Sequence, residues 1–259
     1  MRHLEKKYTP VYTPRFRLAD GSLVGIEVRV KCGHKCVSDF DAFKLVQAGD
    51  GGSLLEQIAG HLSKWSESAG HGLYVSWGVG GTANRAELAL FLDELSRALP
   101  LPQVEIVVEV DNLLASGAMD NCLGLFDGLS GKGVRRGLLH ANQFGFVLDE
   151  LRPSVADELC ASIDMLKLRR VAIVEMKDDI GLASLGHSFI ESLNAQAVDI
   201  VADELYNRSD VALAILLGIR YGQGFFLSRN ETQQKIGKAM RKQPGADFFE
   251  RRFEPSFCY

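Results

Sequence analysis

Hydrophobic positions along this chain follow two different periods. Short apolar runs of the kind that form strands are separated by longer stretches in which apolar residues recur every three or four positions, as on one face of a helix. Strands that alternate with helices predict an α/β fold with a largely parallel sheet. The predicted strands are Tyr12–Leu18, Leu23–Val30, Gly72–Trp77, Val104–Val110, Gly145–Leu148, Ile163–Leu168, Ala197–Ala202 and Ile219–Phe226.

The first two predicted strands form a hairpin, because the turn-forming residues Ala19-Asp20-Gly21-Ser22 lie between them. Pro100 and Pro102 end the helix that begins near Asn84, since proline breaks a helix. The predicted helices are Phe40–Gln47, Leu54–Ala69, Asn84–Leu99, Leu113–Ser130, Ser154–Ala161 and Leu182–Ala195, and Asp210–Leu217 leads into the last strand.

Acidic or amide side chains stand at or near the ends of several predicted strands. In a parallel α/β barrel the carboxyl ends of the strands converge on one rim, so residues far apart in the sequence can meet in one site. The pattern favours a magnesium or manganese phosphate site, although helix caps and surface ion pairs would explain the same residue types taken alone. These residues are Glu27, Glu109, Asp149, Glu150, Asp203 and Gln223.

Length and charge narrow the possible functions. A single α/β barrel would use nearly all of the 259 residues, of which 46% are hydrophobic and 24% charged. The net charge of −4 provides no positive field for holding DNA. Five irregularly spaced cysteines, with no charged and then apolar leader at Met1–Tyr12, favour a cytoplasmic protein. No apolar run approaches the roughly 20 residues of a membrane span.

Four sequence blocks on predicted strands occur in an order that is typical of one domain family. They are Leu23-Val24-Gly25-Ile26-Glu27-Val28-Arg29-Val30-Lys31, Val108-Glu109-Val110-Asp111-Asn112, Met165-Leu166-Lys167-Leu168-Arg169 and Gly222-Gln223-Gly224-Phe225-Phe226-Leu227-Ser228-Arg229. They resemble the motifs I-V-G-x-E-A-L-L-R, L-E-I-T-E, K-I-D and Q-G-Y-x-F-S-R of the EAL domain of bacterial cyclic di-GMP phosphodiesterases. The last block is the strongest match. The likeness covers about Tyr8 to Arg229, nearly the whole chain.

The resemblance implies a modified TIM-like (β/α) barrel with one antiparallel strand. We expect this barrel domain to span residues 1–229 and a C-terminal extension to span 230–259. The extension combines a basic helix with an aromatic tail, which either packs back over the barrel or serves as a docking segment for a partner or for self-association. Its basic residues are Lys235, Lys238, Arg241 and Lys242, and its phenylalanines are Phe248, Phe249, Phe253 and Phe257.

The resemblance also implies roles for individual residues. Active EAL domains hold two divalent cations, Mg²⁺ or Mn²⁺, which activate a water molecule and clamp the phosphodiester. Lys167 would orient that water, and Asp203 would stand at the general base. Arg29, Lys31 and Gln223 would face the nucleotide. The implied metal ligands are Glu27, Ser76, Glu109, Asp149 and Glu150.

Several of these positions depart from the EAL pattern. Ser76 replaces an asparagine ligand, Asn112 replaces a glutamate, and Asp203 is one methylene shorter than the usual glutamate. Arg29 replaces a leucine and lies two positions beyond Glu27, on the same face of the strand. A permanent cation there would repel a metal ion and pair with Glu27 in its place.

Two functions of different classes stay open. The departures favour a degenerate, non-catalytic EAL-like protein that regulates motility or biofilm signalling by binding a protein partner, cyclic di-GMP, or both. The alternative is a metal-dependent phosphodiesterase that hydrolyses cyclic di-GMP to linear pGpG, which the retained Glu27, Glu109, Asp149, Lys167 and Gln223 favour. We expect neither a DNA nor a membrane partner.

Three further motifs have simpler interpretations. The thiols and imidazole of Cys32-Gly33-His34-Lys35-Cys36 suggest zinc, but no second half of a four-ligand site is present, so a loop tip is favoured. Gly78-Val79-Gly80-Gly81 lacks the lysine of a phosphate loop and is predicted to be a turn. Gly131–Arg136 is a short basic run, which favours a solvated loop over a partner contact.

Overall fold

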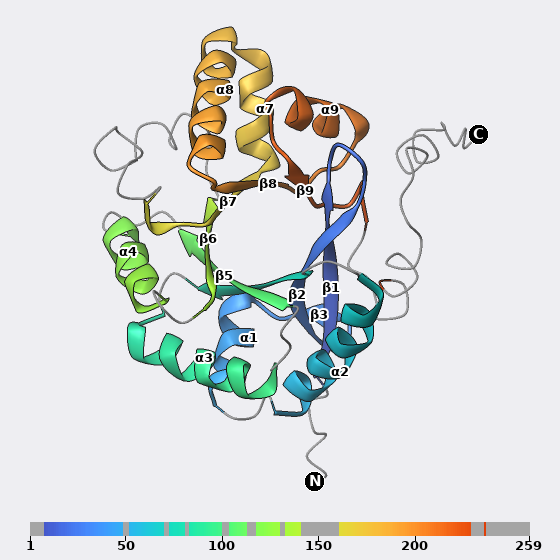
Figure 1. Ribbon diagram of the computed structural model, residues 1–259, viewed down its shortest axis with the longest axis vertical. Helices are drawn as coiled ribbons and strands as arrows, with labels where there is room; N and C mark the ends of the chain where they lie inside the picture. The colour runs from blue at the N-terminus through green and yellow to red at the C-terminus, as the bar shows by residue number, and fades with distance from the viewer. Residues whose placement is uncertain are drawn as a thin grey trace, which may run out of the picture.

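Eight strands close into a ring at the centre of the protein, as the computed structural model in Figure 1 shows. The structure describes residues 8–48, 52–69, 73–80, 83–99, 104–112, 118–129, 133–140, 161–228 and 236. Around the ring the strand order is β1-β9-β8-β7-β6-β5-β4-β2, and β2 pairs again with β1 to close it. The small strand β3 pairs only with β2 among the described strands and lies outside the ring.

The strand directions match the predicted barrel. β1 runs antiparallel to both of its neighbours, β2 and β9, while all ring neighbours from β2 to β9 by way of β4 are parallel. The predicted modified TIM-like barrel with one antiparallel strand is therefore confirmed. The strands are β1 (Tyr8–Arg17), β2 (Leu23–Cys32), β3 (Lys35–Cys36), β4 (Leu73–Gly80), β5 (Val104–Asn112), β6 (Arg135–His140), β7 (Met165–Arg169), β8 (Asp199–Asp203) and β9 (Tyr221–Gly222).

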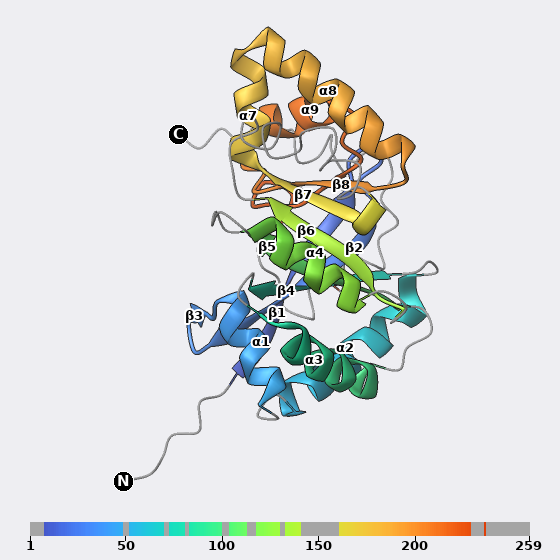
Figure 2. The same ribbon diagram turned by 90° about the vertical axis from the view of Figure 1, so that its left-hand side faces the viewer.

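The helices pack around the outside of the ring (Figures 1 and 2). α1, α2 and α3 gather on one side, and α7, α8 and α9 on the opposite side. Local signals fix where they begin: the Asn84 side chain accepts a hydrogen bond from the Glu87 backbone and completes a capping box at α3. The helices are α1 (Asp39–Gln47), α2 (Gly52–Ala69), α3 (Arg85–Ala98), α4 (Ala118–Leu129), α7 (Arg170–Asp178), α8 (Ile180–Ala195) and α9 (Arg208–Leu216).

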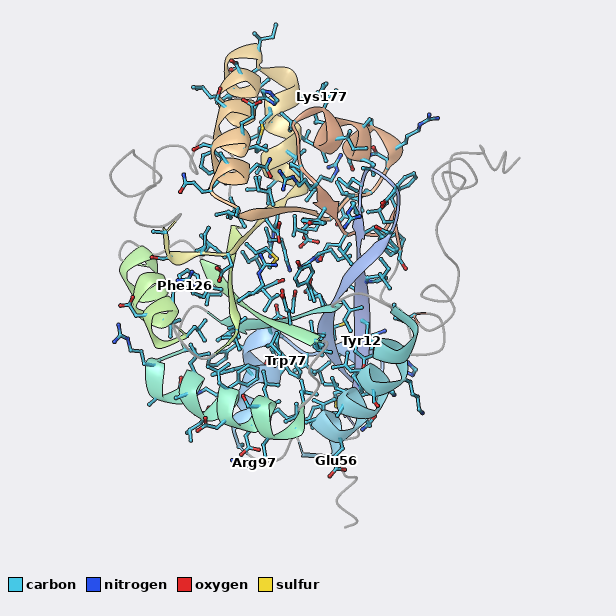
Figure 3. All side chains as sticks on the ribbon, viewed as in Figure 1. Tyr12, Glu56, Trp77, Arg97, Phe126 and Lys177 are labelled. Atoms are coloured by element: carbon cyan, nitrogen blue, oxygen red, sulfur yellow. The ribbon has the colours of Figure 1, made fainter. Side chains whose placement is uncertain are left out.

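The apolar core fills the layer between the strands and the helices (Figure 3). Phe91 of α3 contacts Phe43 of α1 and Trp77 of β4, with ring centroids 5.0 and 5.6 Å apart. Because side chains alternate along a strand, the opposite faces of the same strands point into the ring. Because the outer face of each strand packs against the apolar core, every second residue of the strand points into the barrel.

The sequence pattern missed β6 and α7. The predicted strand Gly145–Leu148 lies outside the described residues, and the strand between β5 and β7 is β6. β6 begins with Arg135 and Arg136, and two charged residues do not predict a buried strand. Their charges are neutralised by residues that are distant in the sequence, so no local pattern marks the strand. Arg135 pairs with Asp199 at 2.8 Å and Arg136 with Asp164 at 3.0 Å. The prediction of a solvated loop is thus wrong for these two arginines.

The predictions for two glycine-containing segments differ in their outcome: one is wrong and the other is confirmed. Gly78 to Gly80 continue β4, so the predicted turn is wrong there, and Gly81 lies outside the described residues. The segment from Cys32 to Cys36 is the tip of the β2–β3 hairpin, as predicted, and Gly33 takes a positive φ of 63° in its turn. Both of its cysteines are free.

The structure describes little of the chain beyond the barrel. Of the predicted C-terminal extension only Ile236 is described, and it is buried in the core. The basic residues and phenylalanines of the extension lie outside the described residues. None of the described helices has the length and apolar character needed to cross a membrane.

Candidate functional site

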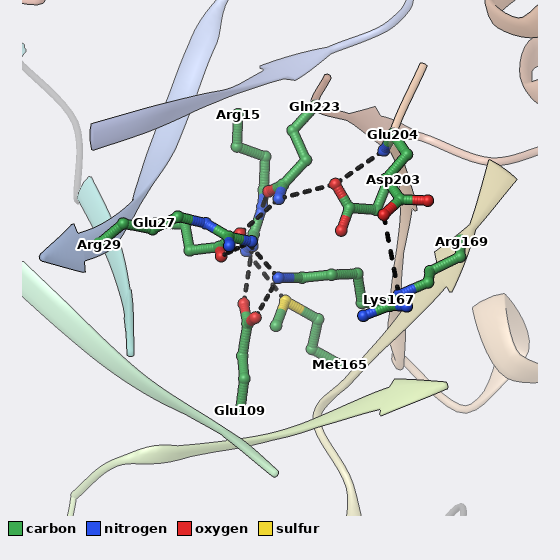
Figure 4. A network of polar contacts seen from close by, with 10 residues as sticks. All are labelled: Arg15, Glu27, Arg29, Glu109, Met165, Lys167, Arg169, Asp203, Glu204 and Gln223. Carbon is green, nitrogen blue, oxygen red and sulfur yellow. Dashed lines mark hydrogen bonds and ion pairs between the residues drawn. The ribbon is translucent and has the colours of Figure 1, made fainter. Parts of the chain in front are cut away.

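A cluster of charged and polar side chains fills the inside of the ring towards the carboxyl ends of its parallel strands (Figure 4). Alternation within each strand selects these residues: in β2, Ile26 and Val28 join the outer core while Glu27 points inward. In β7, Leu166 and Leu168 join that core while Lys167 points inward. The cluster consists of Arg15, Glu27, Arg29, Glu109, Lys167, Asp203 and Gln223.

Glu27 is bound by three side chains. Its Oε1 lies 2.6 Å from Nη2 of Arg29, so the predicted pairing between these two residues is present. Its Oε2 accepts a hydrogen bond from Nζ of Lys167 at 2.8 Å and another from Nε2 of Gln223. Both oxygens of this carboxylate therefore already contact donors from the protein.

Glu109 is held in the same way by Arg15 and Lys167. Nη2 of Arg15 donates to Oε1 of Glu109 at 2.8 Å, and Nζ of Lys167 forms an ion pair with Oε2. Arg15 also donates through Nε to Oε1 of Gln223 at 3.1 Å and contacts Sδ of Met165 at 3.0 Å. The Arg15 side chain is only 2% exposed.

Arg15 is the residue of the cluster that sequence reasoning missed. It lies in β1, two positions beyond Thr13, and both side chains share the inward face. An arginine at an inward position within an apolar strand was the available signal. None of the four blocks that resemble EAL motifs lies in β1, so this signal was not used.

Opposite charges within the cluster keep Glu27 and Lys167 ionised. Burial raises the pKa of Glu27, but Lys167 and Arg29 outweigh it and hold that pKa well below its ordinary value. Burial likewise lowers the pKa of Lys167, but Glu109 and Glu27 raise it above the usual range. The three cations Arg15, Arg29 and Lys167 thus face the three carboxylates of Glu27, Glu109 and Asp203.

Asp203, the expected general base, lies at the edge of this cluster. Its Oδ1 accepts hydrogen bonds from Nε2 of Gln223 at 3.1 Å and from the backbone N–H of Glu204 at 2.7 Å. Burial raises the pKa of Asp203, and Lys167 opposes the rise. Gln223 itself is fully buried and does not line the adjacent pocket.

The described residues do not fit a divalent cation. Mg²⁺ needs several free oxygen ligands, but all four carboxylate oxygens of Glu27 and Glu109 contact protein cations. Ser76 is buried opposite Glu27 in the β2–β4 register, and its short hydroxyl makes no hydrogen bond within the described part of the chain. Nor do the described segments contain a group of three or more His, Cys, Asp or Glu side chains that could hold a metal.

Two implied metal ligands, Asp149 and Glu150, lie outside the described residues, and their role stays a prediction. Their assignment assumed that a barrel strand ends just before them. The strand between β5 and β7 instead ends at His140, well upstream of both residues.

A pocket of about 430 Å³ opens beside the cluster. Arg29 and Lys31 of β2 supply positive charge to its wall, and Asp203 supplies a carboxylate. Tyr206 and Phe225, which are 55% and 56% exposed, present aromatic rings to it. The pocket thus combines cations with aromatic faces, next to a neutralised ionic cluster.

Comparison with known proteins gives structural relatives but no sequence relatives. No model of a known protein family matches the chain, and no curated protein matches it. The structure of the EAL enzyme Bd1971 with cAMP and cyclic di-GMP bound aligns with a TM-score of 0.65 and 14% identity, over 91% of this chain and 65% of that one. An EAL domain protein from Listeria monocytogenes EGD-e aligns with a TM-score of 0.60 and 18% identity, over 90% and 92%.

A third similar structure is the calcium and cyclic di-GMP complex of Klebsiella pneumoniae BlrP1, with a TM-score of 0.59 and 14% identity over 87% of this chain and 56% of that one. The chain therefore spans less than two thirds of the length of the Bd1971 and BlrP1 chains. The protein is an α/β barrel with an ionic cluster inside its rim. Within that class, its fold is the fold of EAL domains, as the sequence motifs indicated.

Proposed function

We propose that this protein binds cyclic di-GMP, without hydrolysing it, in the pocket beside the ionic cluster. Through a protein partner it would then regulate signalling in the setting of motility or biofilm control. The observation that carries the proposal is the pairing of every carboxylate oxygen of Glu27 and Glu109 with a protein donor. The fold of the cyclic di-GMP complexes of Bd1971 and BlrP1 supports the choice of ligand.

The ionic cluster argues against hydrolysis. Two-metal hydrolysis requires carboxylates that hold the ions and a group that orients the attacking water. Lys167, the expected water-orienting residue, is 1% exposed and bound between Glu27 and Glu109. Releasing it would leave both carboxylates in a buried site with less compensation, which is strongly unfavourable.

The pocket suits a nucleotide in size and in chemistry. Ligand pockets commonly enclose roughly 300 to 1,000 Å³, a range that includes this one. The phosphates of a cyclic dinucleotide would meet Arg29 and Lys31, and its guanine bases would stack on Tyr206 or Phe225. Metal-dependent hydrolysis to linear pGpG is the second candidate, favoured by the retention of Glu27, Glu109 and Lys167 at the rim.

A calorimetric titration with cyclic di-GMP, paired with an assay for pGpG in the presence of Mn²⁺, tests the proposal. We expect saturable binding and no product. Formation of pGpG that Lys167→Ala abolishes would establish the phosphodiesterase instead, whereas product that survives Lys167→Ala would come from a contaminating enzyme. If the protein does not bind cyclic di-GMP at all, the proposed ligand is wrong.

A further inference from the structure

The pocket wall contains a cation in contact with the carboxylate that a metal ion would need. We propose that Arg29 replaces a divalent cation in this site: its guanidinium group, held by Glu27, binds a ligand phosphate directly, so that the pocket recognises a phosphodiester without any metal ion. This inference rests on the proposed function, because it concerns the same pocket and the same class of ligand.

The position of Arg29 connects the buried cluster with the pocket. Its side chain is 35% exposed, whereas that of its partner Glu27 is 3% exposed. The ion pair uses Nη2, while a guanidinium group carries five N–H donors in a planar fork. Since Arg29 also lines the pocket, the same group that neutralises Glu27 can offer donors to a phosphate.

The surrounding residues fix Arg29 before a ligand arrives. Glu27 is itself anchored by Lys167 and Gln223 on its other oxygen. A guanidinium group that rests on an immobile carboxylate loses little freedom when a phosphate binds, and such preorganisation favours affinity. Arg29 therefore differs from a flexible surface arginine, which would have to be ordered by the ligand.

A divalent ion and Arg29 exclude each other at Glu27. An ion bound to Glu27 would compete with Nη2 for Oε1 and would lie close to a permanent positive charge. Three further carboxylates, those of Asp39, Asp203 and Glu109, also lie near enough to Arg29 to raise the pKa of its guanidinium group. Added metal should therefore leave ligand binding unchanged instead of promoting it.

Other arginines near the rim provide the comparison. Arg15 is buried and its donors are taken by Glu109, Gln223 and Met165, so it supports the cluster without reaching the pocket. Arg169, at the end of β7, is 34% exposed, and its Nε lies 4.0 Å from Oε1 of Glu204. Arg169 is not among the residues that line the pocket, so Arg169→Leu removes the same charge from the same rim without removing a pocket donor.

The test is calorimetry with cyclic di-GMP on the wild type, Arg29→Leu, Arg29→Lys and Arg169→Leu, each measured with EDTA and then with Mn²⁺. The wild type should bind equally well in both buffers. Arg29→Leu should weaken binding by about tenfold or more, the effect of losing a charge-assisted contact. Arg29→Lys keeps the charge but loses the fork, so its affinity should be intermediate. Arg169→Leu should stay within about threefold of the wild type.

The outcomes separate this inference from the proposed function. Wild-type protein that binds only with Mn²⁺, or an Arg29→Leu variant that binds as the wild type does, overturns the role of Arg29 and leaves the proposed ligand intact. Equal loss of affinity in Arg29→Leu and Arg169→Leu overturns it as well, because a general charge effect would then explain both. No binding in either buffer overturns both proposals. If Arg29→Leu does not fold, Arg29→Lys decides whether the guanidinium group binds the phosphate. Binding as strong as that of the wild type overturns this role, and weaker binding supports it.

Discussion

Glu27 contacts three other members of the ionic cluster, as many as Gln223 does. Arg29, Lys167 and Gln223 contact its two oxygens, and these partners come from β2, β7 and the segment after β9. The charge of Glu27 compensates two cations, Lys167, which is 1% exposed, and Arg29, which is 35% exposed. The protonation state of one carboxylate therefore affects contacts across the barrel.

Glu27→Gln should lower the free energy of unfolding by roughly 3 kcal/mol near pH 7, because it removes one of the two carboxylates that compensate the buried Lys167. The pKa of Glu27 in the folded protein lies below its ordinary value of 4.5, since Lys167 and Arg29 outweigh burial. A carboxylate with a lowered pKa stabilises the fold fully above its unfolded pKa and loses that contribution as the pH falls through the folded pKa.

Urea unfolding of the wild type and Glu27→Gln from pH 7 down to about pH 3 measures this effect. The difference in stability should be largest above pH 4.5 and should narrow at lower pH. A difference that stays constant over the whole range would show that the charge of Glu27 does not stabilise the fold.

How far the site could be predicted differs from residue to residue. The pairing of Arg29 with Glu27 followed from a period of two along a strand, which needs only local sequence. The contacts of Arg15 with Glu109 and Gln223 join β1, β5 and the segment after β9, and no local pattern specifies such partners. The positions of Asp149 and Glu150 depended on placing the strand before them, which the sequence pattern did not achieve.

At the scale of elements, strands with uninterrupted apolar faces were predictable and others were not. β5 has an uninterrupted apolar face at Val104, Ile106, Val108 and Val110, and β1 and β2 are joined by a tight turn, so local sequence specifies them. β6 begins with two arginines whose partners, Asp164 and Asp199, lie in distant segments. α7 follows β7 without an intervening loop, and its N-cap residue Arg169 makes no side-chain cap, so no start signal marks it.

The turn after β9 shows how one element shapes the pocket. Gly224 has a φ of 141°, and a Cβ atom there would lie 2.2 Å from the backbone nitrogen of Leu205. The turn carries Phe225 and Ser228, which line the pocket. Only glycine allows this close approach of the turn to the segment after β8.

Gly224→Ala should displace the turn, weaken cyclic di-GMP binding by about tenfold and lower stability by roughly 3 kcal/mol. Gly133→Ala is the matched control, because Gly133 also has a positive φ, of 72°, but a Cβ atom there would meet nothing within 4 Å. That variant should cost only about 1 kcal/mol of stability and leave binding intact. Calorimetry and thermal unfolding measure both quantities. Equal binding by the two variants would contradict the proposed role of the turn.

At the scale of the whole molecule, the ring closes unevenly. Two residue pairs, Phe16 with Gly222 and Arg17 with Tyr221, join β1 to β9, whereas β4 and β5 are joined by eight. The Arg15 side chain adds a contact across this junction by donating to Gln223. The pocket lies over the same junction, because it includes Thr13 of β1 together with Gly224 and Phe225 beyond β9.

Hydrogen exchange should therefore detect ligand binding most clearly at this junction. Local opening is easiest where few backbone hydrogen bonds hold two strands together. Amides of β1, of β9 and of Leu18, which follows β1 and donates to the carbonyl of Arg220 at 2.8 Å, should exchange faster than those of β4 and β5 in the free protein. A ligand that contacts both sides of the pocket stabilises the closed ring and should slow exchange at β1 and β9 selectively.

Mass spectrometry of exchanged peptides, with and without saturating cyclic di-GMP, measures this selectivity. The β4–β5 pair is the internal control, because its eight residue pairs lie outside the pocket. Exchange slowed equally at β4 and β5 would indicate general stabilisation of the fold. Exchange slowed only at the β1–β9 junction would locate the ligand over that junction.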